Sequence, residues 1–175
     1  MSNEILLKFD LHEGDPIDED IIQNVLLGQE KQRIRERALR ILAYRKRSVE
    51  ELKTRLMKIG FDKDLVREII EEFVRDSVLN DDDFTEAFIA DYTNLKPKGN
   101  IFISRELAKK GISKEAIQNA LRMRDEDQIV KDFLQKKLSH FNLKNPKDRQ
   151  KILRRLLSRG FTPRLVYGLL DSHEK

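Results

Sequence analysis

The sequence has 175 residues, of which 38% are charged and only 7% aromatic, a balance that suits solvated helices with thin apolar seams rather than one large core. It contains no cysteine, which excludes disulfides, thiolate zinc sites and thiol catalysis and fits a reducing cytoplasm. No apolar run approaches the length of a membrane-spanning helix and no signal peptide is visible, so we expect a cytoplasmic protein without a membrane partner.

The first thirty residues are acidic, with one basic and eight acidic side chains and a net charge of −7. Apolar residues alternate from Ile5 to Leu11, as in a short strand, and Asp15-Pro16 then opens a short helix. Gly28 is expected to break or bend the chain before the next helix. Because a lone strand has no partner here, we interpret residues 1–30 as a capping segment, with a dedicated interaction arm as the alternative.

Three similar windows follow, RLMKIGFDKDLVREII, ELAKKGISKEAIQNAL and RLLSRGFTPRLVYGLL, whose turn glycines are Gly60, Gly111 and Gly160, 51 and 49 residues apart. Each glycine has a leucine four positions before it and Phe or Ile directly after it, the pair that meets in a Schellman cap around a left-handed glycine. The next residue in each window is a good N-cap: Asp62, Ser113 or Thr162. Each window therefore predicts two helices joined by a tight turn.

A further helix precedes each pair, at about 32–45, 82–94 and 125–138. The second helices are expected to begin at a Ser48-x-x-Glu51 capping box, at Asn100, and at Asn145 with a proline behind it. We therefore predict an all-α fold, an elongated array of three tandem three-helix repeats of helix-turn-helix type. The expected repeats cover residues 31–79, 80–124 and 125–175.

Charge is distributed in blocks. Residues 62–91 carry three basic and eleven acidic side chains, whereas residues 31–59 carry eleven basic and three acidic ones, residues 92–124 eight and two, and residues 144–175 nine and three. The second helix of every repeat lies in a positive block. Aligned basic helices would suit a polyanion or an acidic protein groove, the alternative being three solvated faces. The candidate binding residues are Arg45, Lys46, Arg47, Lys53, Arg55, Lys58, Lys96, Lys98, Arg105, Lys109, Lys110, Arg154, Arg155 and Arg159.

No pattern in the sequence indicates chemistry. The run Asp81-Asp82-Asp83 opens a helix, where carboxylates cap and favour the helix dipole, so we interpret it as a cap rather than a metal site. His12, His140 and His173 lie far apart without ligand spacing. The Gly-rich phosphate loop and the nucleophile elbow are both missing. We therefore expect a non-enzyme that uses no cofactor and no metal.

An ordered set of motifs runs through the first two repeats: Ala38-Leu39-Arg40-x-Leu42, Arg47-Ser48-x-x-Glu51-Leu52, Leu56-x-x-x-Gly60-Phe61, Leu79-Asn80-Asp81-x-x-Phe84 and Glu106-Leu107-x-x-Lys110-Gly111-Ile112. In this order and spacing they resemble the RecX family of bacterial recombination regulators, with weaker similarity through the third repeat. Gly99-Asn100 stands where the family commonly shows Gly-Pro, which we interpret as a change of helix cap. The β-hairpin that members often carry ahead of the acidic segment is not expected here.

The resemblance implies a non-catalytic inhibitor that lies along the groove of the RecA recombinase filament, blocks its extension and lowers its ATP hydrolysis and its assistance of repressor cleavage. It also implies weaker binding to single- and double-stranded DNA, and we expect a monomer. From the residues alone, two alternatives stay open: a DNA-binding protein that acts without a recombinase, and a helical adaptor for another protein. Because the third helix of the first repeat is acidic, DNA binding is expected to be sequence-independent and salt-sensitive.

Overall fold

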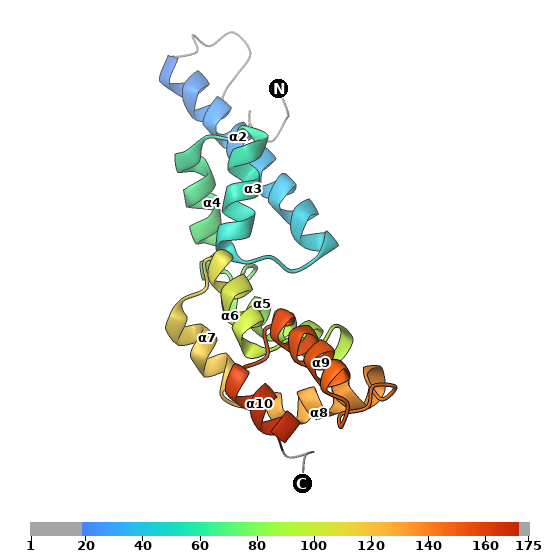
Figure 1. The fold of residues 1–175 in the computed structure, drawn as a ribbon. Helices are drawn as coiled ribbons and strands as arrows, with labels where there is room; N and C mark the ends of the chain where they lie inside the picture. Colours follow the sequence, from blue (N-terminus) through green and yellow to red (C-terminus); the bar gives the residue numbers. More distant parts are fainter. Residues whose placement is uncertain (1–18, 172–175) are drawn as a thin grey trace. The chain divides into compact units, whose positions relative to one another are not determined.

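The computed structural model describes residues 19–171, and within that range its regular elements are helices joined by short links, with no strand (Figure 1). The all-α fold class is thus confirmed. In chain order the elements are α2 (Glu19–Tyr44), α3 (Val49–Ile59), α4 (Lys63–Arg75), α5 (Asp81–Ala90), the π-helical turn η1 (Asp91–Leu95), α6 (Asn100–Lys109), α7 (Lys114–Leu121), α8 (Glu126–Lys137), α9 (Pro146–Ser158) and α10 (Pro163–Asp171). The strand predicted between Ile5 and Leu11 and the helix start at Asp15 lie outside the described residues.

The helices form three consecutive groups of three, α2–α4, α5–α7 and α8–α10, which we call repeats 1, 2 and 3. By its internal contacts the chain divides into two compact units. The first takes in the described chain up to Arg45 together with Leu52–Leu79, and the second takes in Lys46–Glu51 and the chain from Asn80 onward. Repeats 2 and 3 therefore belong to one unit. The boundaries assigned to the repeats from the sequence stay predictions.

A glycine closes the turn between the second and third helix of each repeat. Gly60, Gly111 and Gly160 have φ values of 104°, 84° and 78°, in the left-handed region where a side chain is strained. In repeats 2 and 3 the amide after the glycine donates to the carbonyl of the leucine four positions before it, at 3.2 and 3.3 Å. The predicted Schellman geometry is confirmed in these two repeats.

Most helix starts also follow the prediction. The confirmed N-caps are Asp62, Ser113 and Asn145. The Ser48 hydroxyl accepts the amide of Glu51. The exception is α6, which begins at Asn100 with Gly99 as its N-cap and no side-chain cap bond. The interpretation of Asn100 as a replacement cap is therefore wrong. The contacts of the backbone amides at the start of α6, given below, explain why.

Helix α2 runs without interruption through Gly28, from Glu19 to Tyr44. The predicted break is wrong because one glycine costs a helix only about 1 kcal/mol relative to alanine, and the neighbouring Leu, Gln, Glu and Lys residues are good helix formers. The limit predicted between residues 30 and 31 consequently falls inside α2.

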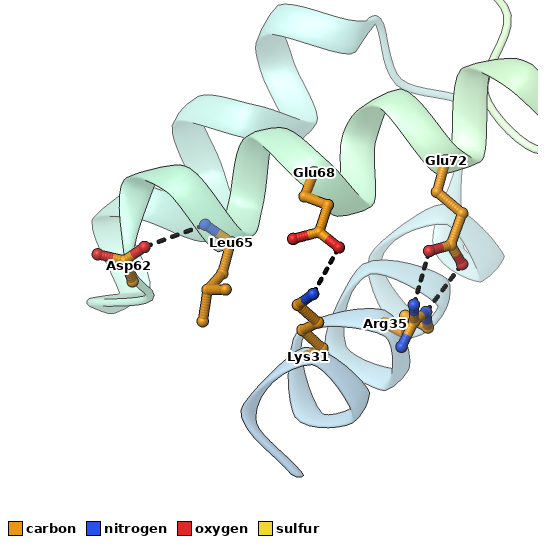
Figure 2. A network of polar contacts seen from close by, with 6 residues as sticks. All are labelled: Lys31, Arg35, Asp62, Leu65, Glu68 and Glu72. Atoms are coloured by element: carbon orange, nitrogen blue, oxygen red, sulfur yellow. Dashed lines mark hydrogen bonds and ion pairs between the residues drawn. The ribbon is translucent and has the colours of Figure 1, made fainter. Parts of the chain in front are cut away.

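Two ion pairs join α2 to α4 within the first unit (Figure 2). Lys31 Nζ lies 2.5 Å from Glu68 Oε1. The Arg35 guanidinium donates to both carboxylate oxygens of Glu72, at 2.8 and 2.6 Å. Two carboxylates on the acidic face of α4 are thus paired with cations of α2 in the same unit. From the sequence we interpret this acidic face as a poor surface for a DNA duplex.

Replacing Glu72 by Gln should lower the free energy of unfolding of the first unit by about 1 kcal/mol at pH 7. The reason is that a two-point Arg–carboxylate pair contributes more to stability than an ordinary surface ion pair. The hydrogen bond from Arg35 holds the pKa of Glu72 below its ordinary value of 4.5. The pair's contribution is therefore present above that value and is lost as the pH falls through the folded-state pKa. Urea unfolding of both proteins at pH 7 and in acid measures the difference. The exposed Glu71→Gln variant is the control, and an equal loss in both variants would contradict the prediction.

Repeats 2 and 3 each have an apolar core of residues from all three helices. In repeat 2 the buried residues are Phe84, Ile103, Leu107, Ile112 and Ile117. In repeat 3 they are Val130, Phe133, Leu138, Ile152, Leu156, Phe161, Val166, Leu169 and Leu170. These cores fix the helices that carry the groove described next.

Candidate partner-binding surface

Repeats 2 and 3 meet backbone to backbone at two glycines. The Gly99 amide donates to the Arg159 carbonyl at 3.0 Å, and the Ile101 amide donates to the Gly160 carbonyl at 3.1 Å. A Cβ on Gly99 would lie 2.0 Å from the Gly160 carbonyl oxygen. Since Gly99 has an ordinary φ of −77°, the close approach of the two chains is what requires glycine here.

Glu126, in the first turn of α8, ties the same place together. It is only 8% exposed, and its carboxylate accepts the Asn100 amide at 2.6 Å and the Thr162 hydroxyl at 2.7 Å. The first amide of α6 is thus satisfied by a side chain of the next repeat. The Ile101 amide, which an N-cap side chain could otherwise accept, donates to the Gly160 carbonyl, so α6 needs no side-chain cap of its own.

The segment 46–51 makes an equivalent contact with repeat 2, inside the same unit. The Val49 amide donates to Asp81 Oδ1 at 2.9 Å, and the Ser48 hydroxyl donates to the Lys110 carbonyl at 2.8 Å. Burial raises the pKa of Asp81. The two contacts follow one pattern. Asp81, at the start of α5, accepts the first amide of α3, and Glu126, at the start of α8, accepts the first amide of α6.

The interpretation of the aspartate run as a helix start is consistent with these contacts. Asn80 caps α5, and Asp81, Asp82 and Asp83 occupy its first turn. Among residues 19–171 no group of three His, Cys, Asp or Glu side chains could hold a metal ion. Within the same range, no helix is both long enough and apolar enough to cross a bilayer.

Arg124, in the link between α7 and α8, holds the segment before α6. It donates four hydrogen bonds: to Thr93 Oγ1 at 2.8 Å, to the Lys98 carbonyl at 2.6 Å, to the Tyr92 carbonyl at 3.3 Å and to Asn100 Oδ1. Burial lowers the pKa of Arg124, while a neighbouring carboxylate opposes that shift. The bonds fasten the segment at both ends.

The fastened segment contains the π-helical turn η1. The Lys96 amide donates to the Asp91 carbonyl, five residues back, at 3.0 Å. Pro97 then ends the turn, because the residue before a proline is disfavoured in the helical region. Leu95, the last residue of the turn, is 74% exposed. Such turns are rare and often mark functional sites.

A groove of about 590 Å³ lies between this turn and repeat 3, within the size range of ligand sites. One side comes from η1 and Lys96-Pro97, and the other from α8 and α9. Its apolar lining residues are Leu95, Pro97, Ile129 and Phe133. Its cations are Lys96, Lys136, Lys137, Arg155 and Arg159, against a single carboxylate, Asp132. We call it the basic groove.

Arg159 supports the groove as well as lining it. Its Nη1 donates to the Pro97 carbonyl at 3.0 Å, and its guanidinium carbon lies 4.4 Å from the centre of the Phe133 ring. Burial lowers the pKa of Arg159, and the positive charge of Arg155 adds to that effect. The arrangement concentrates positive charge over an apolar surface.

Several predicted cations are instead engaged inside the second unit. Lys110 Nζ lies 2.5 Å from a Glu51 carboxylate oxygen. Lys109 and Arg105 both reach Glu106, at 2.9 and 3.4 Å, and the hydrogen bond from Lys109 is the main cause of the lowered pKa of Glu106. These two lysines and one arginine are thus already paired with carboxylates of the same unit.

Two family models match consecutive parts of the chain: the first three-helix domain of RecX matches residues 35–73, and the second three-helix domain of RecX matches residues 80–121. The chain belongs to the RecX family. Two curated relatives are both named "Regulatory protein RecX". The one from Halalkalibacterium halodurans is 31% identical over 95% of this chain and 64% of its own length, and the one from Bacillus subtilis 30% identical over 98% and 66%. The chain thus spans just under two thirds of their length.

Solved structures share the RecX fold. A crystal structure of "regulatory protein RecX" superposes with a TM-score of 0.77 at 21% identity, over 98% of this chain and 86% of that one. RecX from Lactobacillus salivarius gives a TM-score of 0.68 at 22% identity, over 83% and 97%. The three-helix repeat predicted from the sequence agrees with the three-helix domains that the two family models describe.

In this RecX-family chain the basic groove gathers three of the predicted residues, Lys96, Arg155 and Arg159, and adds two that the sequence analysis missed, Lys136 and Lys137. The prediction considered second helices, whereas these lysines end α8, a first helix. Lysine is common at helix C-termini, where its positive charge interacts favourably with the helix dipole. Lysines at the end of α8 therefore did not indicate a binding site in the sequence.

The other predicted residues lie outside the groove. Exposed among them are Arg45, Lys46, Arg55, Lys58, Arg105, Lys109 and Arg154, and partly buried are Arg47, Lys53, Lys98 and Lys110. Their part in partner binding stays a prediction.

Proposed function

We propose that this chain is a non-catalytic regulator of homologous recombination that binds the RecA recombinase filament, blocks its extension and lowers its ATP hydrolysis and co-protease activity. The ordered pair of RecX domain matches across residues 35–121 carries the proposal. Relatives named as regulatory proteins over nearly the whole of this chain add support.

The basic surface suggests how binding would work. The second helices α3, α6 and α9 carry cations in each repeat, and the basic groove adds a concentrated site in repeats 2 and 3. Acidic walls of a protein filament or DNA phosphates are the matching surfaces. Because each repeat can contribute a weak contact, the contacts together can give tight binding without any strong single one.

Single-stranded-DNA-dependent ATP hydrolysis by the cognate RecA recombinase tests the proposal. We expect strong suppression at far less than one molecule per recombinase protomer, since a bound regulator stops growth of a whole filament. Reversing two exposed cations of α9, Arg154→Glu with Arg155→Glu, should raise the protein concentration needed for half suppression by about tenfold, because two repulsive contacts replace attractive ones. Lys147→Glu, on the same helix and outside the groove, is the matched control.

If the double variant suppressed ATP hydrolysis at the same concentrations as the wild-type chain, these α9 cations would not be part of the binding surface. No suppression by the wild-type chain, even in excess, would contradict the proposed function. The positive blocks would then favour a sequence-independent DNA-binding protein. That alternative predicts an affinity for labelled oligonucleotides that is the same for unrelated sequences and falls steeply with salt.

A further inference from the structure

The cations of the basic groove differ from their neighbours on the same helices. On α8, Lys131 pairs with Asp127, and on α9, Lys151 lies 3.5 Å from Asp148. Within residues 19–171, by contrast, no ion pair or hydrogen bond engages the side chains of Lys96, Lys136, Lys137 and Arg155. The lone groove carboxylate, Asp132, accepts from Gln128 at 2.7 Å. Positive charge is therefore left available at the groove.

The same groove exposes an apolar surface between these cations. Leu95 is 74% exposed, and Pro97 and Ile129 line the groove beside it. An exposed leucine on a turn that Arg124 and Arg159 hold in place offers a fixed contact for an apolar side chain. Preformed surfaces lose little entropy on binding, which favours recognition.

The lining also discriminates between two kinds of polyanion. Single-stranded nucleic acid is held through bases that stack on exposed aromatic rings. The one aromatic residue of this groove, Phe133, is only 5% exposed and is covered by the Arg159 guanidinium. The groove therefore lacks a stacking platform, while its mixture of cations and aliphatic surface matches an acidic peptide with an apolar side chain.

We propose that the basic groove binds an acidic peptide segment of a partner protein, whose carboxylates meet Lys96, Lys136, Lys137 and Arg155 and whose apolar side chain packs on Leu95. This inference rests on the proposed function only for the identity of the partner, which would be the recombinase. It assigns the contact to the side of repeats 2 and 3 that carries η1, α8 and α9.

Fluorescence anisotropy with the full chain and no recombinase tests the groove directly. The probe is a fluorescein-labelled peptide rich in Asp and Glu with two central leucines, and its comparison is the same peptide with serines in place of the leucines. We expect the leucine peptide to bind at least fivefold more tightly than the serine peptide. Lys136→Glu with Arg155→Glu should weaken it at least tenfold, whereas Lys147→Glu, which leaves the groove intact, should change it less than twofold.

The Leu95→Ser variant separates the peptide from nucleic acid. It removes an exposed side chain, so the fold should survive, as a thermal melt followed by circular dichroism would check. It should lower the affinity for the leucine peptide about fivefold and leave the affinities for the serine peptide and for labelled oligothymidylate unchanged. Equal affinity of both peptides, or tighter binding of oligothymidylate that the double reversal abolishes, would overturn the inference. The recombinase assay on wild-type protein reports separately on the proposed function.

Discussion

Replacing Gly99 by Ala is expected to destabilise the second unit by about 3 kcal/mol, near the upper end for overpacking. The added Cβ would lie 2.0 Å from the Gly160 carbonyl oxygen and 2.1 Å from the Phe161 amide nitrogen. Both are backbone atoms, so no flexible side chain can yield. The hydrogen bonds between the two segments would have to lengthen before the methyl group fits, and the contact between repeats 2 and 3 would open.

Urea unfolding followed by circular dichroism measures the loss, and hydrogen exchange read by mass spectrometry locates it in α6 and α9. Gly28→Ala is the matched control: Gly28 lies within α2 and no atom lies within 4 Å of the added Cβ. Since alanine favours a helix, this variant should raise stability by about 1 kcal/mol. A Gly99→Ala protein as stable as the wild type would show that the backbones do not approach as described.

The turns could be predicted because their causes are local. A left-handed glycine with a leucine before it and an apolar residue after it specifies a Schellman cap within six residues, and Gly111 and Gly160 fulfil it. The helical stripes are also local, since their period can be read directly. Gly28 shows the limit of local rules, because the helix propensity of its neighbours outweighs one glycine.

The groove could not be predicted, because residues far apart in the chain build it. Arg159 reaches the Pro97 carbonyl over 62 residues, and Glu126 reaches the Asn100 amide over 26. Such contacts leave no periodic pattern in a single sequence. Counting positive charge selected the cations of α9 and also Lys110, which the structure pairs with Glu51 at 2.5 Å. Charge alone does not show which cations are already paired with a carboxylate inside the protein.

Replacing Arg124 by Met is expected to lower the stability of the second unit by about 3 kcal/mol, since it removes the charged donor from the Lys98 carbonyl, Thr93 Oγ1 and Asn100 Oδ1. Methionine keeps much of the apolar bulk but donates nothing. The exposed Arg122→Met variant, in the same link, is the control and should change stability by less than about 0.5 kcal/mol.

The loss should be concentrated in η1 and the residues after it. Arg124 does not line the basic groove, yet its bonds hold the turn that carries Leu95 and Lys96. In the variant the Lys96 and Lys98 amides should therefore exchange hydrogen faster. The affinity for the acidic leucine peptide should fall about fivefold. Arg124→Lys should recover only part of both, because an ammonium cannot reproduce the planar fork of a guanidinium. Unchanged exchange of these two amides in Arg124→Met would mean that the π-helical turn stands without Arg124, and that the shape of the groove comes from Pro97 and Arg159 instead.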